Sequence, residues 1–113
     1  DGEPAGFGDA LCALADLLRD RPVLAARTAD REISELFSGY RGQRAMPIAA
    51  ALPSARRLMG RGDLAGALFA LALTQVGGGR TAWTLPWREI LRDLRDSPHL
   101  EVRQEAWDIS VVD

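Results

Sequence analysis

The chain has 113 residues, a length that fits one domain able to bury its own core without a disulfide or a metal. Its 47% apolar and 27% charged residues are the balance of a folded globular protein, which excludes a disordered chain. Fourteen basic residues, all of them Arg, face sixteen acids, and the formal charge of -2 argues against a general nucleic-acid binder, which would carry a basic excess.

Helix is favoured over sheet, because Ala and Leu dominate the apolar residues and no alternating strand pattern of useful length occurs. Residues 1–8 are rich in Gly and Pro and predict a flexible lead-in, which leaves a single all-α domain over residues 9–113. Asp9 is a candidate N-cap for a first helix over about residues 10–20. Helical spacing gives this helix an apolar face of Leu11, Leu14, Ala15, Leu17 and Leu18.

A second helix is predicted to begin at Pro22 and to end at Ser38-Gly39, where Gly39 can adopt the left-handed conformation. Thr28 is a candidate cap for a restart, so this segment fits either one helix or two short ones. The apolar positions follow steps of three and four: Ala26, Ala29, Ile33, Leu36, Phe37 and Tyr40. A loop is expected over residues 41–47.

Pro53 predicts a start or a kink, because proline lacks an N–H and clashes with the preceding turn. We therefore expect a short turn over residues 48–52 and a helix over about 54–60. Asp63 is a good N-cap for the next helix, over about 64–76, and the three glycines of residues 77–79 are predicted to end it.

The fifth helix is predicted to begin after Thr84, with Pro86 in its first turn and an apolar face of Trp87, Ile90, Leu91 and Leu94. Ser97-Pro98 signals the start of the last helix, over about residues 98–110. Its inward positions are predicted to be Leu100 or Val102, Ala106, Trp107 and Ile109.

Two segments look like helical hairpins. Residues 54–73, SARRLMGRGDLAGALFALAL, resemble a tetratricopeptide-type hairpin, and residues 87–109 resemble a HEAT-type hairpin through their Ser-Pro turn and the EVRQEA start. The HEAT-type resemblance implies that Val102 and Ala106 pack inward and Arg103 faces outward. No internal repeat is evident, and a solenoid needs about three. The sequence therefore predicts a compact bundle of five to six short helices built from hairpins.

No residue set for catalysis, metal binding or cofactor binding emerges. His99 is interpreted as a capping or surface residue, and Cys12 lies in a leucine-rich run where a thiolate is disfavoured. Arg61-Gly62-Asp63 spells a cell-adhesion tripeptide but is explained by a turn followed by an N-cap. The Gly77–Thr81 segment lacks the Lys and the strand of a phosphate loop. With one cysteine and no long apolar run, we expect a cytoplasmic, non-enzymatic protein without a membrane span.

Function is therefore sought at the surface, where aromatic residues and Arg anchor protein interfaces. Trp83 is expected to lack a packing role, because the glycine-rich loop places it outside helical periodicity. The predicted partner-binding residues are Tyr40, Arg41, Arg44, Arg80, Trp83, Arg88 and Arg92.

These features predict a module that binds another protein, with an immunity or antitoxin-type protein of a bacterial conflict system as one version. An adaptor or regulatory domain of a larger protein is an alternative. A helical DNA-binding regulator using Arg56 and Arg57, or the Arg88–Arg95 stripe, is another.

Overall fold

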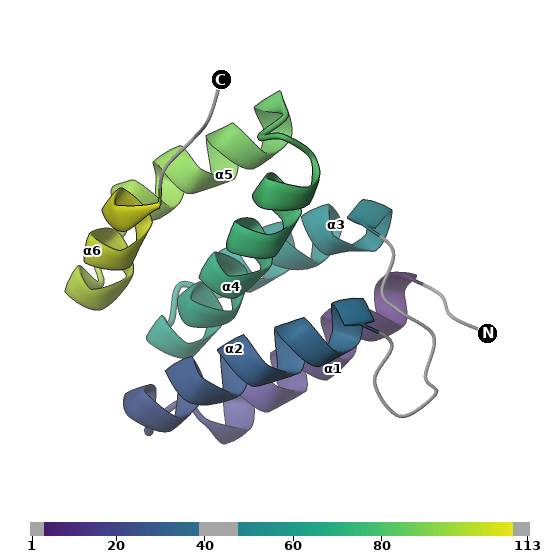
Figure 1. The fold of residues 1–113 in the computed structure, drawn as a ribbon. Helices are drawn as coiled ribbons and strands as arrows, with labels where there is room; N and C mark the ends of the chain where they lie inside the picture. The colour runs from purple at the N-terminus through teal and green to yellow at the C-terminus, as the bar shows by residue number, and fades with distance from the viewer. Residues whose placement is uncertain (1–3, 39–47, 110–113) are drawn as a thin grey trace.

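The computed structural model describes residues 4–38 and 48–109, and within these ranges every regular element is a helix (Figure 1). The all-α prediction is confirmed. The helices are α1 (Pro4–Leu17), α2 (Pro22–Ser38), α3 (Ile48–Met59), α4 (Leu64–Arg80), α5 (Leu85–Arg95) and α6 (Leu100–Asp108).

The helices form two layers, with α4 in contact with each of the other five (Figure 1). In one layer α3 packs against α1 and α5, and in the other α4 packs against α2 and α6. The predicted hairpins are present as the packed pairs α3–α4 and α5–α6. The radius of gyration is 12.9 Å, close to the value of about 13 Å for a compact chain of this length, so the predicted compact bundle is confirmed.

Small residues allow α4 to be enclosed by its neighbours. Twelve of its seventeen residues are buried, and most of the twelve are Ala, Gly or Leu. At Gly66 a Cβ atom would stand 2.7 Å from the carbonyl oxygen of Leu58, so only glycine permits this approach of α3 to α4. The α4 N-terminus is capped by Asp63, as predicted, whose carboxylate accepts a hydrogen bond from the Gly66 N–H at 3.1 Å.

The three glycines do not end this helix, and that prediction is wrong. The helix continues to Arg80, and Gly77 and Gly78 are buried within it. A Cβ atom at Gly77 would overlap the Trp87 ring, and one at Gly78 would overlap the Trp83 ring. Gly77 and Gly78 therefore form a flat surface on which the two indoles pack. This packing outweighs the low helix propensity of glycine.

The turn that follows α4 carries Trp83 back onto the helix. Ala82 and Trp83 both have left-handed backbones, with φ of 57° and 58°, a conformation that costs about 1 to 2 kcal/mol per non-glycine residue. The Trp83 N–H donates to the Gly78 carbonyl at 2.7 Å, and Arg88 Nε donates to the Trp83 carbonyl at 2.7 Å. Trp83 is only 7% exposed, so the expectation that it lacks a packing role is wrong.

Several helix starts also differ from the predictions. The first helix begins at Pro4, so residues 4–8 are not a flexible lead-in and Asp9 lies inside the helix, where it cannot be the N-cap. Thr28 is buried within a continuous α2 and starts no second helix. Pro53 lies inside α3, where its missing N–H costs one intrahelical hydrogen bond close to the helix start. The packing of α3 against α1, α4 and α5 outweighs that cost.

The predicted faces of α5 and α6 are confirmed in part. All four residues of the α5 face are buried, as are Val102 and Ala106 of α6. Trp107 is 63% exposed, so its predicted core position is wrong. Leu17 of α1 is 77% exposed, and among the described helices none covers either side chain.

The packing of indoles on the glycines can be tested with two alanine variants of neighbouring positions. Gly77→Ala should destabilise the protein by about 1 to 3 kcal/mol, because the added methyl group overlaps the Trp87 ring. Gly79→Ala is the control: no atom lies within 4 Å of its Cβ position, so alanine should stabilise the helix by about 1 kcal/mol. Urea unfolding followed by circular dichroism measures both, and equal stabilities of the two variants would contradict the packing.

Candidate functional site

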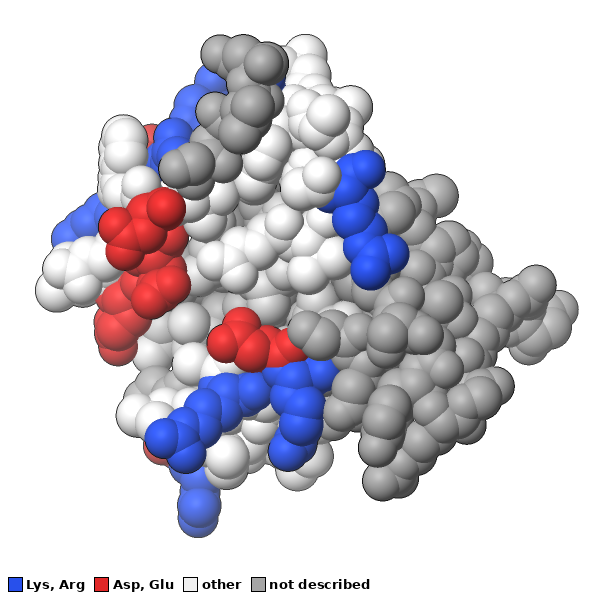
Figure 2. All heavy atoms as spheres, in the orientation of Figure 1, with Lys and Arg blue, Asp and Glu red and all other residues white. Residues whose placement is uncertain are grey.

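A groove lies between α2, α4 and α6, with a volume of about 400 Å³ (Figure 2). Its floor is apolar and consists of Leu68, Leu71 and Ala72 of α4, which are 5–8% exposed. Figure 2 shows acidic side chains on both sides of this uncharged floor. The acidic rim is formed by Asp30 of α2 and by Glu101, Glu105 and Asp108 of α6.

The four rim carboxylates are not neutralised. Within residues 4–38 and 48–109, none of them takes part in an ion pair or a side-chain hydrogen bond. Glu105 and Asp108 also lie in the last turn of α6, where the helix dipole disfavours negative charge, and that turn contains no basic residue. Glu105 and Asp108 therefore gain nothing from the helix dipole, and their charge is available to a ligand.

The α5–α6 pair holds the α6 side of the groove in place through Arg95. Its Nε donates to the Ala106 carbonyl at 3.1 Å and its Nη2 to the Ile109 carbonyl at 2.8 Å, which satisfies the C-terminal end of α6. The guanidinium also stacks on Trp107 at 4.6 Å from the ring centre. Trp107 is thus an exposed but ordered indole, next to Asp108 of the rim.

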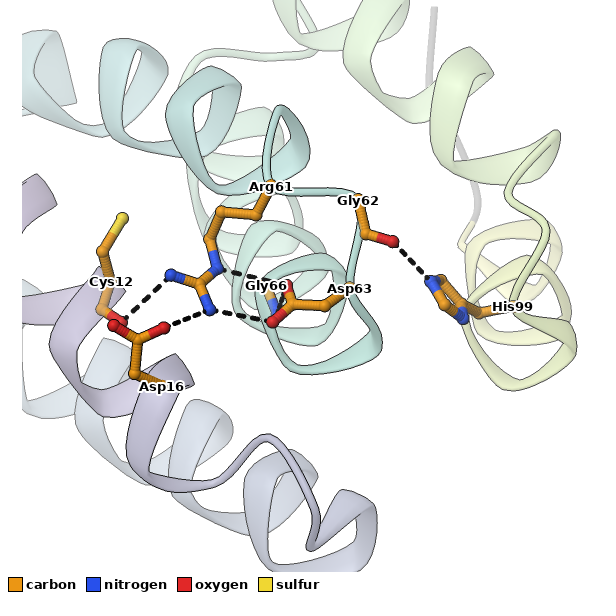
Figure 3. Close-up of polar contacts among 7 residues, drawn as sticks. All are labelled: Cys12, Asp16, Arg61, Gly62, Asp63, Gly66 and His99. Carbon is orange, nitrogen blue, oxygen red and sulfur yellow. Dashed lines mark hydrogen bonds and ion pairs between the residues drawn. The ribbon is translucent and has the colours of Figure 1, made fainter.

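A second polar cluster lies at the turn between α3 and α4 (Figure 3). Arg61 Nε and Nη2 donate to the two carboxylate oxygens of Asp63 at 3.1 and 2.8 Å, and Nη2 also donates to Asp16 of α1 at 2.6 Å. A longer bond joins Arg61 Nη1 to the Cys12 carbonyl at 3.4 Å. The cluster ties α1 to the start of α4.

The ionisation of this pair follows from the geometry. Hydrogen bonding from Arg61 holds the pKa of the Asp63 carboxyl below its usual value, and the carboxylates of Asp63 and Asp16 raise the pKa of Arg61. Gly62 supplies the left-handed backbone of the turn, with φ of 79°. Arg61 and Asp63 are bonded to each other and Asp63 caps α4, which confirms the interpretation of this tripeptide as a turn followed by an N-cap.

His99 and Cys12 are not brought together. The His99 ring lies 3.3 Å from the Gly62 carbonyl, while Cys12 lies on the other side of the Arg61–Asp63 turn (Figure 3). His99 occupies the N-cap position of α6 without a side-chain capping bond. Among the described residues, no group of three or more His, Cys, Asp or Glu side chains is placed to hold a metal ion.

The sequence-predicted partner residues do not form the groove. Tyr40, Arg41 and Arg44 lie outside the described residues. Arg80 and Arg92 are exposed, on α4 and α5, and neither lines the groove.

Two other residues of that prediction have structural roles. Arg88 holds the Trp83 carbonyl, and the Trp83 ring packs on Gly78, so we remove Trp83 from the candidate site. Arg95 caps α6, so the expected arginine stripe along α5 is not a continuous free surface.

The sequence did not predict the groove, although the spacing of three of its acidic residues can be seen in the sequence. Glu101, Glu105 and Asp108 follow helical steps of four and three and therefore share one face of α6. Nothing in the sequence places Asp30, some seventy residues earlier, opposite that face.

No protein-family model, curated protein or solved structure matches the chain. Within the described ranges, no helix combines the length and apolar character needed to cross a membrane.

The pKa of Asp63 predicts how stability changes in acid. Its folded value lies below its unfolded value of about 3.9, so the unfolded chain takes up the proton first as the pH falls. The Arg61–Asp63 pair thus contributes its full stability at pH values above the pKa of Asp63 in the unfolded chain. This stability is lost as the pH falls through the lower pKa of Asp63 in the folded protein.

Asp63→Asn keeps a capping side chain but removes this titration. Urea unfolding at a series of pH values should show a shallower loss of stability in acid for Asp63→Asn than for the wild type. Asp20→Asn, which removes an exposed carboxylate without a side-chain bond in the described ranges, is the control. If Asp63→Asn has the acid dependence of the wild type, the pair does not stabilise the fold.

Proposed function

We propose that this chain is a non-catalytic module that binds another protein through the groove between α2, α4 and α6. One observation carries the proposal: four carboxylates without cationic partners in the described ranges surround an apolar floor. An exposed apolar hollow is a typical docking site, and unpaired charges around it select a partner of opposite charge.

The chemistry of the groove defines the partner segment. An apolar side chain seated on Leu68, Leu71 and Ala72 gains the hydrophobic contact, while Arg or Lys residues at its edges pair with the rim. An amphipathic helix with a basic border has this pattern and fits grooves between helices. Trp107, ordered by Arg95, extends the same surface beyond Asp108.

Two biological settings suit such a module. An immunity or antitoxin-type protein binds and blocks a toxin, and an acidic rim complements the basic surfaces of proteins that act on nucleic acids. An adaptor or regulatory domain uses the same groove to recruit a segment of a partner. The DNA-binding alternative stays a prediction and gains no support from the groove, because its carboxylates repel phosphates.

The proposal is tested by capture of proteins from the source organism on the immobilised chain. Glu101→Lys with Glu105→Lys sets two cations against the two remaining rim carboxylates and should abolish retention of the specific partner, because the rim then has no net negative charge to attract a basic segment.

Glu89→Lys with Asp93→Lys is the matched control: it reverses two exposed charges with the same four-residue spacing on α5. Partner retention should match that of the wild type. Circular dichroism verifies that both variants fold. Equal capture by the rim variant and the wild type would contradict the groove, and no retained protein at all would contradict the binding function.

A further inference from the structure

The face that carries the groove also carries a surface of opposite charge at the start of α2. Arg21, Val23, Leu24 and Arg27 line a shallow hollow of about 380 Å³, and we call these four residues the basic corner. Val23 is 70% exposed and Leu24 45% exposed. Figure 2 shows arginine side chains over the N-terminal half of α2, on the same face as the acidic side chains of α6.

The basic corner is complementary in charge to the groove. It presents two aliphatic side chains between two cations, and the groove presents an apolar floor between carboxylates. In the described part of the chain, neither Arg21 nor Arg27 makes an ion pair or a side-chain hydrogen bond. Both surfaces therefore carry unneutralised charge, and each supplies what the other lacks.

The corner cannot fill the groove of its own chain. Both surfaces include residues of α2: Arg27 of the corner is adjacent to Ala26, which lines the groove, and three residues before Asp30 of the rim. A continuous helix cannot fold back onto its own side. The occupant that carries this corner must be a second copy.

We propose that two copies of the chain associate about a two-fold axis, with the basic corner of each seated in the acid-rimmed groove of the other. A two-fold interface uses the same surface on both copies, which requires the two patches to be neighbours, and they are: Ala26 lines the groove and Arg27 lines the corner. The inference rests on the groove as the docking surface of the proposed function. Self-association then occupies the groove, so the dimer and the partner complex exclude each other.

The contact has the properties of a weak, electrostatic interface. Charged rims around small apolar centres give specificity and salt sensitivity more than high affinity. Raising the ionic strength from about 50 mM to about 500 mM shortens the screening length several-fold. The dimer should therefore weaken by about tenfold over that range.

Sedimentation velocity at a series of protein concentrations and low salt tests the proposal. The wild type should sediment as a monomer–dimer equilibrium. Arg21→Glu with Arg27→Glu makes the corner acidic. Glu101→Arg, Glu105→Arg and Asp108→Arg together leave three cations against the one remaining carboxylate of Asp30, which makes the rim basic. Each variant alone should be monomeric, because corner and groove then carry the same sign.

An equimolar mixture of the two variants gives the decisive result. In a mixed pair each acidic surface again faces a basic one, so the mixture should form a one-to-one dimer that high salt dissociates. The charge-matched controls alter exposed residues outside both surfaces: Arg56→Glu with Arg92→Glu for the corner, and Glu89→Arg, Asp93→Arg and Asp96→Arg for the rim. Each control should dimerise alone like the wild type.

A monomeric wild type at all concentrations would overturn the dimer, as would monomers in the variant mixture. A dimer that both variants retain would place self-association elsewhere on the chain and also overturn the proposal. These outcomes leave the capture experiment untouched, because a monomer with an open groove still binds a different protein. Loss of the captured partner from the rim variant, with a monomeric wild type, would separate the two proposals.

Discussion

The central helix α4 contacts all five of the other helices, and the positions of those helices follow from this packing. A helix with so many neighbours must have small residues wherever one of them comes close, and its backbone bonds must be satisfied within the helix. Gly66 lets the C-terminal end of α3 approach the α4 backbone, and Gly77 and Gly78 let the rings of Trp87 and Trp83 pack against it. The one hydroxyl buried within α4, that of Thr74, donates to the Ala70 carbonyl of the same helix at 2.7 Å.

The groove is a consequence of that packing. The α4 residues that form its floor lie between α2 and α6, and α4 packs against both helices. The α6 side depends on a chain of contacts that starts at the glycines: Trp83 and Trp87 pack on α4 and position α5, and Arg95 of α5 then holds the end of α6. The groove is thus built on packed helices, and the partner that we propose would meet a surface already formed.

Charge divides the face that carries the groove into an acidic surface, the rim, and a basic surface, the corner. The Arg61 cluster uses its charges internally, tying α1 to the start of α4, whereas the rim and the basic corner leave theirs unpaired within the described ranges. A near-balanced total charge thus conceals a strongly uneven distribution. Competition between self-association and partner binding for one groove would make the module responsive to its own concentration.

Local chemistry determined much of the fold. Asp63 caps α4, Pro22 starts α2, and the spacing of Trp87, Ile90, Leu91 and Leu94 identifies the buried face of α5, because caps and helical periodicity act within a few residues. The acidic face of α6 is likewise visible in the spacing of Glu101, Glu105 and Asp108.

Only the tertiary structure decided what lies opposite each face. The three glycines signal a helix end on propensity alone, but Trp83 and Trp87 cover two of them and keep the helix intact, since burial of an indole outweighs the propensity cost. Trp107 has the spacing of a core residue, yet none of the helices that the structure describes covers its side of α6. The groove needs α2, α4 and α6 side by side, and its members come together only when α4 is enclosed, because contacts between distant segments are set by packing and not by sequence spacing.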